Sequence, residues 1–274
     1  MIKLGFIGAG HMATALAQGL VARRVMRPAQ MLAADIDARA RRRFSRATGA
    51  KTCTDLSEVL AAAPALVLAV KPQSVAAVIE RIGALANGAR PGQDKLVISI
   101  AAGIPLATLE GGLPGARVIR VMPNAPAMVG EGMAALARGR RAKPADLAFA
   151  HQLFVAVGEA VVVKDEALLD AVTALSGSGP AYVYLFIKAL TEAACAEGLS
   201  APQALAMALQ TVRGAEAQMR QSKLAPDELI RMVASPGGTT EAALRAFEQG
   251  NFVQVVGHAV KAAATRSREL GRSR

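Results

Sequence analysis

The sequence contains no tryptophan, two tyrosines and seven phenylalanines, so aromatic residues make up only 3% of a chain that is 53% hydrophobic. Its core must therefore consist mainly of alanine and branched aliphatic side chains, which suit packed helices and parallel strands. The shortage of aromatic rings also argues against a nucleic-acid platform, because such platforms stack bases on aromatic side chains.

Cysteine and long apolar runs are scarce as well. Cys53 and Cys195 lie far apart and belong to no CxxC or Cys/His cluster, which argues against a disulfide framework or a zinc site. The start, MIKLGFIGAG, lacks the charged region and long apolar core of a signal peptide. The longest apolar run, residues 59–70, is too short to span a membrane. We therefore expect a cytoplasmic protein with no metal and no membrane contact.

Acidic residues are fewer than basic ones, 21 against 32, and the formal net charge is +11. Arginines concentrate in a segment with a helical pattern, where such a run usually forms a solvated face; they are Arg39, Arg41, Arg42, Arg43 and Arg46. No zinc-finger spacing, aromatic RNA-binding motif or basic heptad accompanies them. We expect no nucleic-acid partner, and a surface that attracts small anions.

Two halves of the chain have different periodicities. Up to residue 163, amphipathic segments alternate with short strand-like ones: IKLGFI, QMLAAD, ALVLAV, KLVISI, ARVIRV, GMAALA and EAVVVK. Since several of these are apolar throughout, they predict a parallel sheet covered on both faces. Long Ala/Leu-rich helical segments follow, and the one containing AYVYLFI is apolar nearly all round. The pattern predicts an α/β domain at residues 1–163 and an all-α domain at residues 164–274.

A GxGxxA pattern follows the first predicted strand and opens a helix. Gly8 would allow the tight turn, Gly10 the close approach of a pyrophosphate, and Ala13 close packing of helix on strand. His11 and Met12 complete the turn, and Asp35 ends the next strand, 22 residues beyond Ala13. This context predicts a Rossmann-type dinucleotide site, with phosphate at the helix N-terminus.

A second cofactor contact is predicted where another apolar strand ends, because ligands of such sheets lie at the carboxyl edge. The residues are Ala69, Val70, Lys71 and Pro72. Lys71 could equally be a solvated loop lysine.

The stretch SPGGTT, residues 235–240, lies between two helical patterns. Its glycines would let backbone N–H groups converge on an anion at the mouth of the following helix. It could equally be a helix-to-helix turn in which a threonine caps the second helix.

Candidate general bases are few. His11 lies in the glycine turn, His151 and His258 lie within helical patterns, and no carboxylate pair is evident. Alcohol oxidation normally needs such a base. Reduction of a protonated imine needs less, because positioning and electrostatics carry most of the work.

Several motifs occur in a fixed order: GFIGAGHMA at the start, AVKP at 69–72, SIAAG at 99–103, RVMPNAPA at 120–127, LSGSGPAYVYLFIKAL at 175–190 and SPGGTT at 235–240. Together they resemble pyrroline-5-carboxylate reductase, the last enzyme of proline synthesis, over essentially the whole chain. The resemblance implies NAD(P)H as cofactor and 1-pyrroline-5-carboxylate, a cyclic imine with one carboxylate, as substrate. It also implies a homodimer built by the helical domain, with further assembly into decamers in the family.

The resemblance assigns roles to particular residues. Ser235 and the backbone N–H groups of Gly237, Gly238 and Thr239 would hold the substrate carboxylate, and the Thr240 hydroxyl would bond the ring nitrogen. Met122, Pro123 and Asn124 would form the floor near the nicotinamide. The remaining substrate-pocket residues would be Ser176, Gly177, Ser178, Gly179 and Pro180. The glycine-rich segment 176–180 could instead only join two helices, and the prolines 123 and 126 could only shape a loop.

This sequence departs from the family pattern at three places. Residues 223–226 read KLAP, where the family often has Glu and His-Pro, and Leu56 replaces an Asn that commonly lines the cofactor site. Asp35-Ile36-Asp37 replaces a polar trio that receives the 2′-phosphate of NADPH. A carboxylate there accepts hydrogen bonds from a free ribose hydroxyl but repels a phosphate, so we expect NADH to be favoured. The arginines from Arg39 onward could oppose this preference if one folded back, although we expect them to face solvent.

Two other functions compete with this interpretation. A β-hydroxyacid dehydrogenase would carry a lysine in a GxGxxxK segment, but Val183 stands at that position and Lys188 lies five residues too late. A non-catalytic protein that binds nucleotide or nucleic acid is supported only by the charge.

Overall fold

The computed structural model describes all residues except 87, 89, 91, 273 and 274. It divides into two compact units, one formed by Met1–Ser178 with Ala263–Arg274 and the other by Gly179–Ala262. Within the described residues, no helix is long and apolar enough to cross a bilayer.

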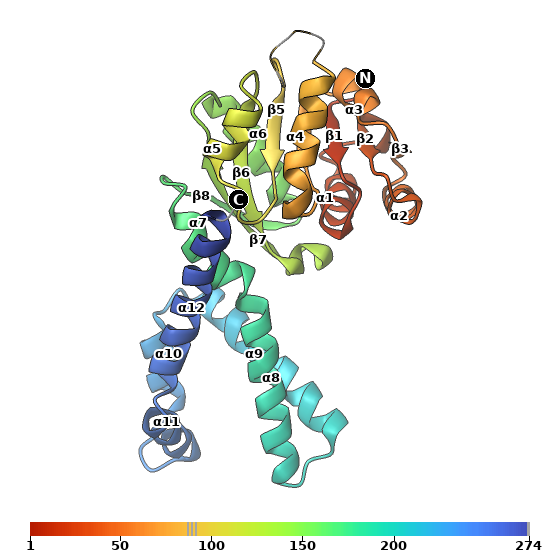
Figure 1. Cartoon of the computed structure of the whole chain (residues 1–274). Coiled ribbons are helices and arrows are strands. Elements are labelled where there is room, and N and C mark those ends of the chain that lie inside the picture. Colours follow the sequence, from red (N-terminus) through yellow and green to blue (C-terminus); the bar gives the residue numbers. More distant parts are fainter. Residues whose placement is uncertain (87, 89, 91, 273–274) are drawn as a thin grey trace. The chain divides into compact units, whose positions relative to one another are not determined.

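The first unit is built on one sheet of eight strands in the order β3-β2-β1-β4-β5-β6-β7-β8 (Figure 1). Neighbouring strands are parallel except β6 and β7, which pair antiparallel. The strands are β1 (Leu4–Ile7), β2 (Met31–Ala34), β3 (Lys51–Cys53), β4 (Ala65–Leu68), β5 (Leu96–Ser99), β6 (Arg117–Pro123), β7 (Gly132–Arg138) and β8 (Gly158–Val162).

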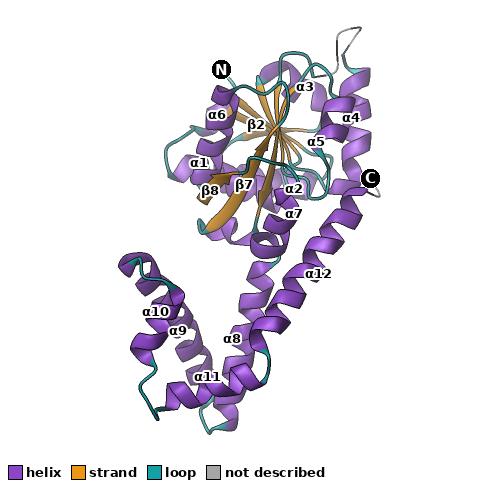
Figure 2. Ribbon diagram, turned by 90° about the vertical axis from the view of Figure 1, so that its left-hand side faces the viewer, coloured by secondary structure: helices purple, strands orange, loops and turns teal. Residues whose placement is uncertain are grey.

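Helices cover both faces of this sheet (Figure 2). One buried cluster includes residues of α1 (His11–Ala22), α2 (Ala38–Thr48) and α6 (Pro144–Val155). The other includes residues of α3 (Leu56–Ala62), α4 (Val75–Ala84), α5 (Leu106–Gly112) and α7 (Leu168–Val172). Shorter turns complete the unit: η1 (Pro28–Gln30), η2 (Pro72–Ser74), η3 (Ala125–Val129) and the π-helix η4 (Thr173–Gly177).

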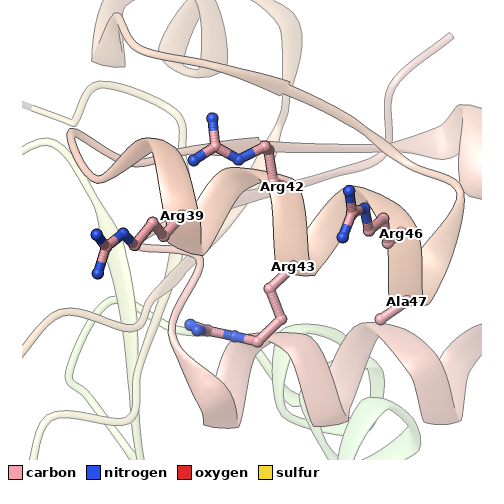
Figure 3. Close-up of a pocket in the computed structure, with 5 residues that line it drawn as sticks. All are labelled: Arg39, Arg42, Arg43, Arg46 and Ala47. Atoms are coloured by element: carbon pink, nitrogen blue, oxygen red, sulfur yellow. The ribbon is translucent and has the colours of Figure 1, made fainter.

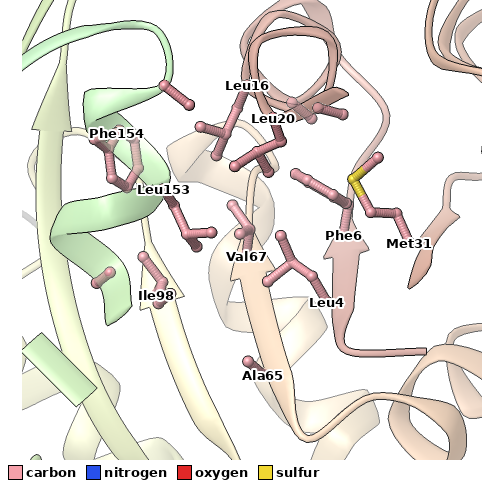
Figure 4. Close-up of a cluster of buried hydrophobic side chains, with 14 of the residues drawn as sticks. Leu4, Phe6, Leu16, Leu20, Met31, Ala65, Val67, Ile98, Leu153 and Phe154 are labelled. Atoms are coloured by element: carbon pink, nitrogen blue, oxygen red, sulfur yellow. The ribbon is translucent and has the colours of Figure 1, made fainter. Parts of the chain in front are cut away.

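The two clusters follow from the alternation of side chains along each strand. Leu4 and Phe6 of β1 belong to the cluster with α1, whereas Ile7 belongs to the cluster on the other face. Figure 4 shows the first cluster, in which the aliphatic side chains of α1 lie over β1 and β4. Phe6 also packs edge-on against Phe44 of α2, with ring centres 5.3 Å apart. The doubly covered α/β domain predicted from the apolar strands is confirmed.

The sheet differs from the prediction at two places. Strand β3 was not predicted, because Lys51–Cys53 is short and only partly buried and so carries no apolar run. The expectation of a parallel sheet is wrong at β7. Only residues 124–131 connect β6 to β7, and a parallel crossover requires a dozen residues or more.

The second unit consists of helices: α8 (Gly179–Ala196), α9 (Ala201–Ser222), α10 (Pro226–Val233), α11 (Thr239–Gln249) and the first part of α12 (Phe252–Arg272). Phe252 packs against both Phe186 and Phe247, with ring centres 6.4 and 5.1 Å away. None of the residues of α8 is buried within the chain, and Tyr184 and Leu185 are 63% and 65% exposed. A helix this apolar therefore needs a surface from outside its own chain.

Candidate functional site

The carboxyl ends of β1 and β4 approach each other closely at Gly8. The Gly8 N–H donates to the Ala34 carbonyl and the Ala69 N–H donates to the Ile7 carbonyl, both at 2.8 Å. Gly8 has a φ of +100°, and a Cβ at this position would lie 2.7 Å from the Ala69 carbonyl oxygen. Since only glycine has no Cβ, this turn depends on glycine here.

The second glycine of the fingerprint, Gly10, lies beside open space. No atom lies within 4 Å of where a Cβ would stand on Gly10. Gly10 is the N-cap of α1, no side chain caps this end, and the first turn holds no acidic residue. Of the other fingerprint residues, Ala13 is buried, Met12 half-buried and His11 exposed. An uncapped helix end with room beside its glycine fits a phosphate group.

Asp35 follows β2 and is bonded to the glycine turn. Its Oδ2 accepts a hydrogen bond from the Ala9 N–H at 2.7 Å, and its Oδ1 accepts one from the Asp37 N–H at 2.8 Å. Arg41 does not pair with this carboxylate: its Nη1 donates to the Asp35 carbonyl at 2.6 Å. Ile36 is 90% exposed. The fingerprint glycines and the acidic residue are thus brought together as predicted.

Ala69, Val70, Lys71 and Pro72 lie on the same edge, after β4. Pro72 begins the turn η2, for which Lys71 is the N-cap. Lys71 is exposed, while the other three are half-buried. This segment adjoins the glycine turn through the contact between Gly8 and Ala69.

Asn124 at the end of β6 binds the segment that precedes α8. Its Nδ2 donates to the Ser176 carbonyl at 3.0 Å, and its Oδ1 accepts from the Met133 N–H at 2.8 Å. A Cβ on Gly177 would lie 2.7 Å from Cε of Met122. Residues 122–124 and 176–177 therefore lie together, and the hydrogen bond from the Asn124 side chain to the Ser176 carbonyl joins them. Pro123 is buried, and Ser178, Gly179 and Pro180 are half-buried.

A partly buried ion pair reinforces this region. Nη1 of Arg120, which is 9% exposed, lies 2.5 Å from Oε1 of Glu166, and the same oxygen accepts the Leu106 N–H at 2.7 Å. The pair joins β6, the start of α5 and the segment before α7. Neither Arg120 nor Glu166 was predicted to be important, because an arginine within an apolar strand was the only sequence feature that pointed to the pair.

The SPGGTT stretch forms a tight turn before α11. The Gly238 N–H donates to the Ser235 carbonyl at 3.0 Å, and Gly237 has a φ of +70°. Gly238, not a threonine, is the N-cap, and no side chain caps it. The Gly237 N–H donates to Oε2 of Glu241 at 2.6 Å. The hydroxyl-bearing residues Thr239 and Thr240 occupy the first turn of α11, and Thr240 is half-buried.

Burial raises the pKa of the Cys53 thiol, reinforced by the nearby Glu58 and Asp55 carboxylates. The thiol lies 3.3 Å from the Asp55 carbonyl, to which it donates. No group of His, Cys, Asp and Glu among the described residues could hold a metal ion.

Comparison with known proteins shows which families this chain is similar to. A profile described as pyrroline-5-carboxylate reductase dimerisation matches residues 166–270, and one described as NADP oxidoreductase, coenzyme F420-dependent, matches residues 3–103. The chain is 41% identical to a pyrroline-5-carboxylate reductase of Methanosarcina acetivorans, with 98% of each chain covered. It is 43% identical to one of Pseudomonas aeruginosa, with 98% of this chain and 96% of the relative covered.

Solved structures of pyrroline-5-carboxylate reductases have the same fold as this chain. A pyrroline-5-carboxylate reductase of Coxiella burnetii superposes with a TM-score of 0.90 at 32% identity. A pyrroline carboxylate reductase of Plasmodium falciparum with NADP bound superposes with a TM-score of 0.86 at 30% identity. In both cases 98% of each chain is covered.

Replacement of Gly8 and of Gly10 by alanine should affect the free energy of unfolding differently. Gly8→Ala should lower the free energy of unfolding by about 1–3 kcal/mol, because the positive φ and the Ala69 carbonyl both oppose a Cβ. Gly10→Ala should change it by less than about 0.5 kcal/mol, because the position is open and its φ is −68°. Denaturant unfolding of the two variants checks this, and equal stabilities would contradict it.

Proposed function

The chain belongs to the pyrroline-5-carboxylate reductase family, and on that premise we propose how its residues bind the substrate and the cofactor. The protein is an NAD(P)H-dependent oxidoreductase that reduces 1-pyrroline-5-carboxylate to L-proline, the last step of proline biosynthesis. The observation that carries this conclusion is the similarity to pyrroline-5-carboxylate reductases over essentially the full length of the chain. A fall in absorbance at 340 nm on mixing protein, reduced cofactor and substrate tests it.

The residues of the first unit fit a dinucleotide. Gly8, Gly10, His11, Met12 and Ala13 would hold the pyrophosphate at the uncapped start of α1, where the chain leaves room. Asp35 would bind the ribose, and Ala69, Val70, Lys71 and Pro72 would line the same edge of the sheet. Met122, Pro123 and Asn124 would form the floor under the nicotinamide. The bound cofactor supplies a hydride for the imine carbon.

The turn before α11 would hold the substrate carboxylate. Ser235 and the N–H groups of Gly237, Gly238 and Thr239 are its proposed donors. In the structure Glu241 already accepts from the Gly237 N–H, so the substrate carboxylate would take the place of a carboxylate that belongs to the chain. This supports an anion site, because the turn already binds a carboxylate group.

Thr240 would orient the substrate for reduction. Its hydroxyl would hydrogen-bond the ring nitrogen, which keeps the imine carbon facing the cofactor. Ser176, Gly177, Ser178, Gly179 and Pro180 would line the pocket, and the Asn124–Ser176 bond fixes the first of them. An iminium carbon accepts hydride directly, so the site needs no strong general base.

The competing functions lack comparable support. A β-hydroxyacid dehydrogenase would need a lysine where Val183 stands, and the full-length relatives described above are reductases of a cyclic imine. A non-catalytic nucleotide-binding protein would not need the SPGGTT turn.

The helical half is proposed to begin near residue 164 and to build the subunit interface. The dimerisation profile matches residues 166–270, and the apolar side chains of α8 and α12 lie exposed in the single chain, among them Tyr184, Leu185 and Val253. The protein forms homo-oligomers, and we propose that its dimers assemble further into decamers. Light scattering at micromolar concentration should show no monomer of 28.2 kDa. A monomer would contradict the interface, and a stable dimer alone would contradict only the decamer.

Replacement of Thr240 tests its orienting role. Thr240→Val should reduce kcat on the order of 10- to 1000-fold without abolishing it, as for the loss of one positioning contact. Thr239→Val is the matched control, because this position is proposed to act through its backbone N–H, which valine keeps. Wild-type turnover in Thr240→Val, or equal losses in the two variants, would remove Thr240 from the mechanism.

Cofactor preference depends on Asp35 in this proposal. Its carboxylate is fixed beside the glycine turn by two backbone N–H groups, and there it would accept a ribose hydroxyl and repel a 2′-phosphate. We therefore propose that NADH is preferred and NADPH is accepted more weakly. The ratio of kcat/KM for the two cofactors measures this, and Asp35→Asn should move the ratio toward NADPH. Asp37→Asn is the control, since Asn caps a helix as well as Asp does; a clear NADPH preference of the wild type would contradict the proposal.

A further inference from the structure

The Glu241 side chain occupies a backbone donor of the SPGGTT turn. Its Oε2 accepts the Gly237 N–H at 2.6 Å. Its Oε1 lies 3.4 Å from Nη2 of Arg245, which follows one turn later on α11. The carboxylate of Glu241 therefore bridges a donor of the turn and a cation of its own helix.

This contact differs from an ordinary helix cap. In a capping box, the side chain of the third helical residue bonds the backbone N–H of the N-cap. Glu241 is the third residue of α11, but the N–H of the N-cap, Gly238, donates to the Ser235 carbonyl at 3.0 Å. Glu241 reaches one residue further back, to Gly237, whose φ of +70° is left-handed. The bond therefore takes up a donor that the proposed function assigns to the substrate.

Another carboxylate can replace Glu241 at this donor. The Glu241 side chain is 43% exposed, so water can solvate its carboxylate once it leaves the turn. Arg245 lies on the same helix and remains available to the displaced charge. The first N–H groups of a helix have no partner inside that helix, and no side chain caps α11. An anion that enters the turn therefore gains donors while Glu241 keeps a partner of opposite charge.

We propose that Glu241 is an intramolecular competitor of the substrate carboxylate and thereby raises the KM of the enzyme for its substrate. The inference rests on the proposed role of the SPGGTT turn. While Glu241 is bonded to Gly237, the turn lacks one donor, and the apparent affinity falls in proportion to the fraction of molecules whose turn is free. The product carries the same carboxylate, so the competitor weakens product binding as well.

Steady-state kinetics of Glu241→Gln and Glu241→Ala test the proposal. Glutamine removes the charge and keeps an acceptor, whereas alanine removes the competing group altogether. The KM for 1-pyrroline-5-carboxylate should fall by about 3- to 10-fold, and further in Glu241→Ala than in Glu241→Gln. The inhibition constant of L-proline should fall by the same factor in each variant. The kcat should not fall, because the competitor acts on binding and not on hydride transfer.

Glu248→Gln is the matched control. Glu248 is exposed, lies on α11 seven residues beyond Glu241, and its replacement removes the same charge. Its KM should stay within about twofold of the wild-type value, because an isolated exposed charge has little effect. Thermal unfolding followed by circular dichroism verifies that the variants are folded. A capping role alone predicts that Glu241→Ala is less stable and has an unchanged KM, and this result would overturn the proposal.

Ser235→Ala separates this inference from the proposed function. The Ser235 hydroxyl is a proposed donor to the same substrate carboxylate, so its loss should raise KM. A raised KM in Ser235→Ala, with no decrease in either Glu241 variant, overturns the competition and leaves the substrate site in place. An unchanged KM in Ser235→Ala and in both Glu241 variants removes the turn from the substrate site and overturns both. Equal decreases in Glu241→Gln and Glu248→Gln would show a general effect of charge and would also overturn the competition.

Discussion

The approach of β1 to β4 at Gly8 is the constraint on which the site depends. No side chain fits between this turn and the Ala69 carbonyl, so the chain must reverse there without a Cβ. The reversal directs the Ala9 N–H to the Asp35 carboxylate and leaves Gly10 open at the start of α1. The conformation of the proposed cofactor edge is therefore tied to the packing of β1 against β4.

Two polar side chains, the buried Asn124 and the partly buried Glu166, connect further segments of the same unit. Asn124 and Glu166 each bond two partners from different segments. The Asn124 bond holds the segment before α8 against β6, and because Asn124 is buried, loss of its partner would cost about 1–3 kcal/mol. The Glu166 bonds hold the segment before α7 against β6 and α5.

The distribution of charge follows the chemistry of the ligands. The substrate carries a carboxylate and the cofactor carries phosphate groups, and the chain carries an excess of positive charge. Near the proposed sites, the Asp35 carboxylate accepts from backbone N–H groups. Glu241 accepts from the Gly237 N–H with one oxygen, and its other oxygen lies 3.4 Å from Nη2 of Arg245. Within the described residues, Arg39, Arg42, Arg43 and Arg46 of α2 (Figure 3) form no ion pair with a carboxylate.

Local patterns in the sequence determined the Rossmann-type unit, the glycine fingerprint with Asp35, and the helical second half, because periodicity and glycine spacing act over a few residues. Strand β3 escaped prediction because it is short and only partly buried. Strand β7 was predicted, but its antiparallel direction was not, because the short connection from β6 sets that direction. Only the tertiary structure decided that Asn124 bonds Ser176 and that Arg120 pairs with Glu166. Such contacts join residues about 50 positions apart, and no local pattern encodes which buried polar groups the packed chain brings within hydrogen-bond distance.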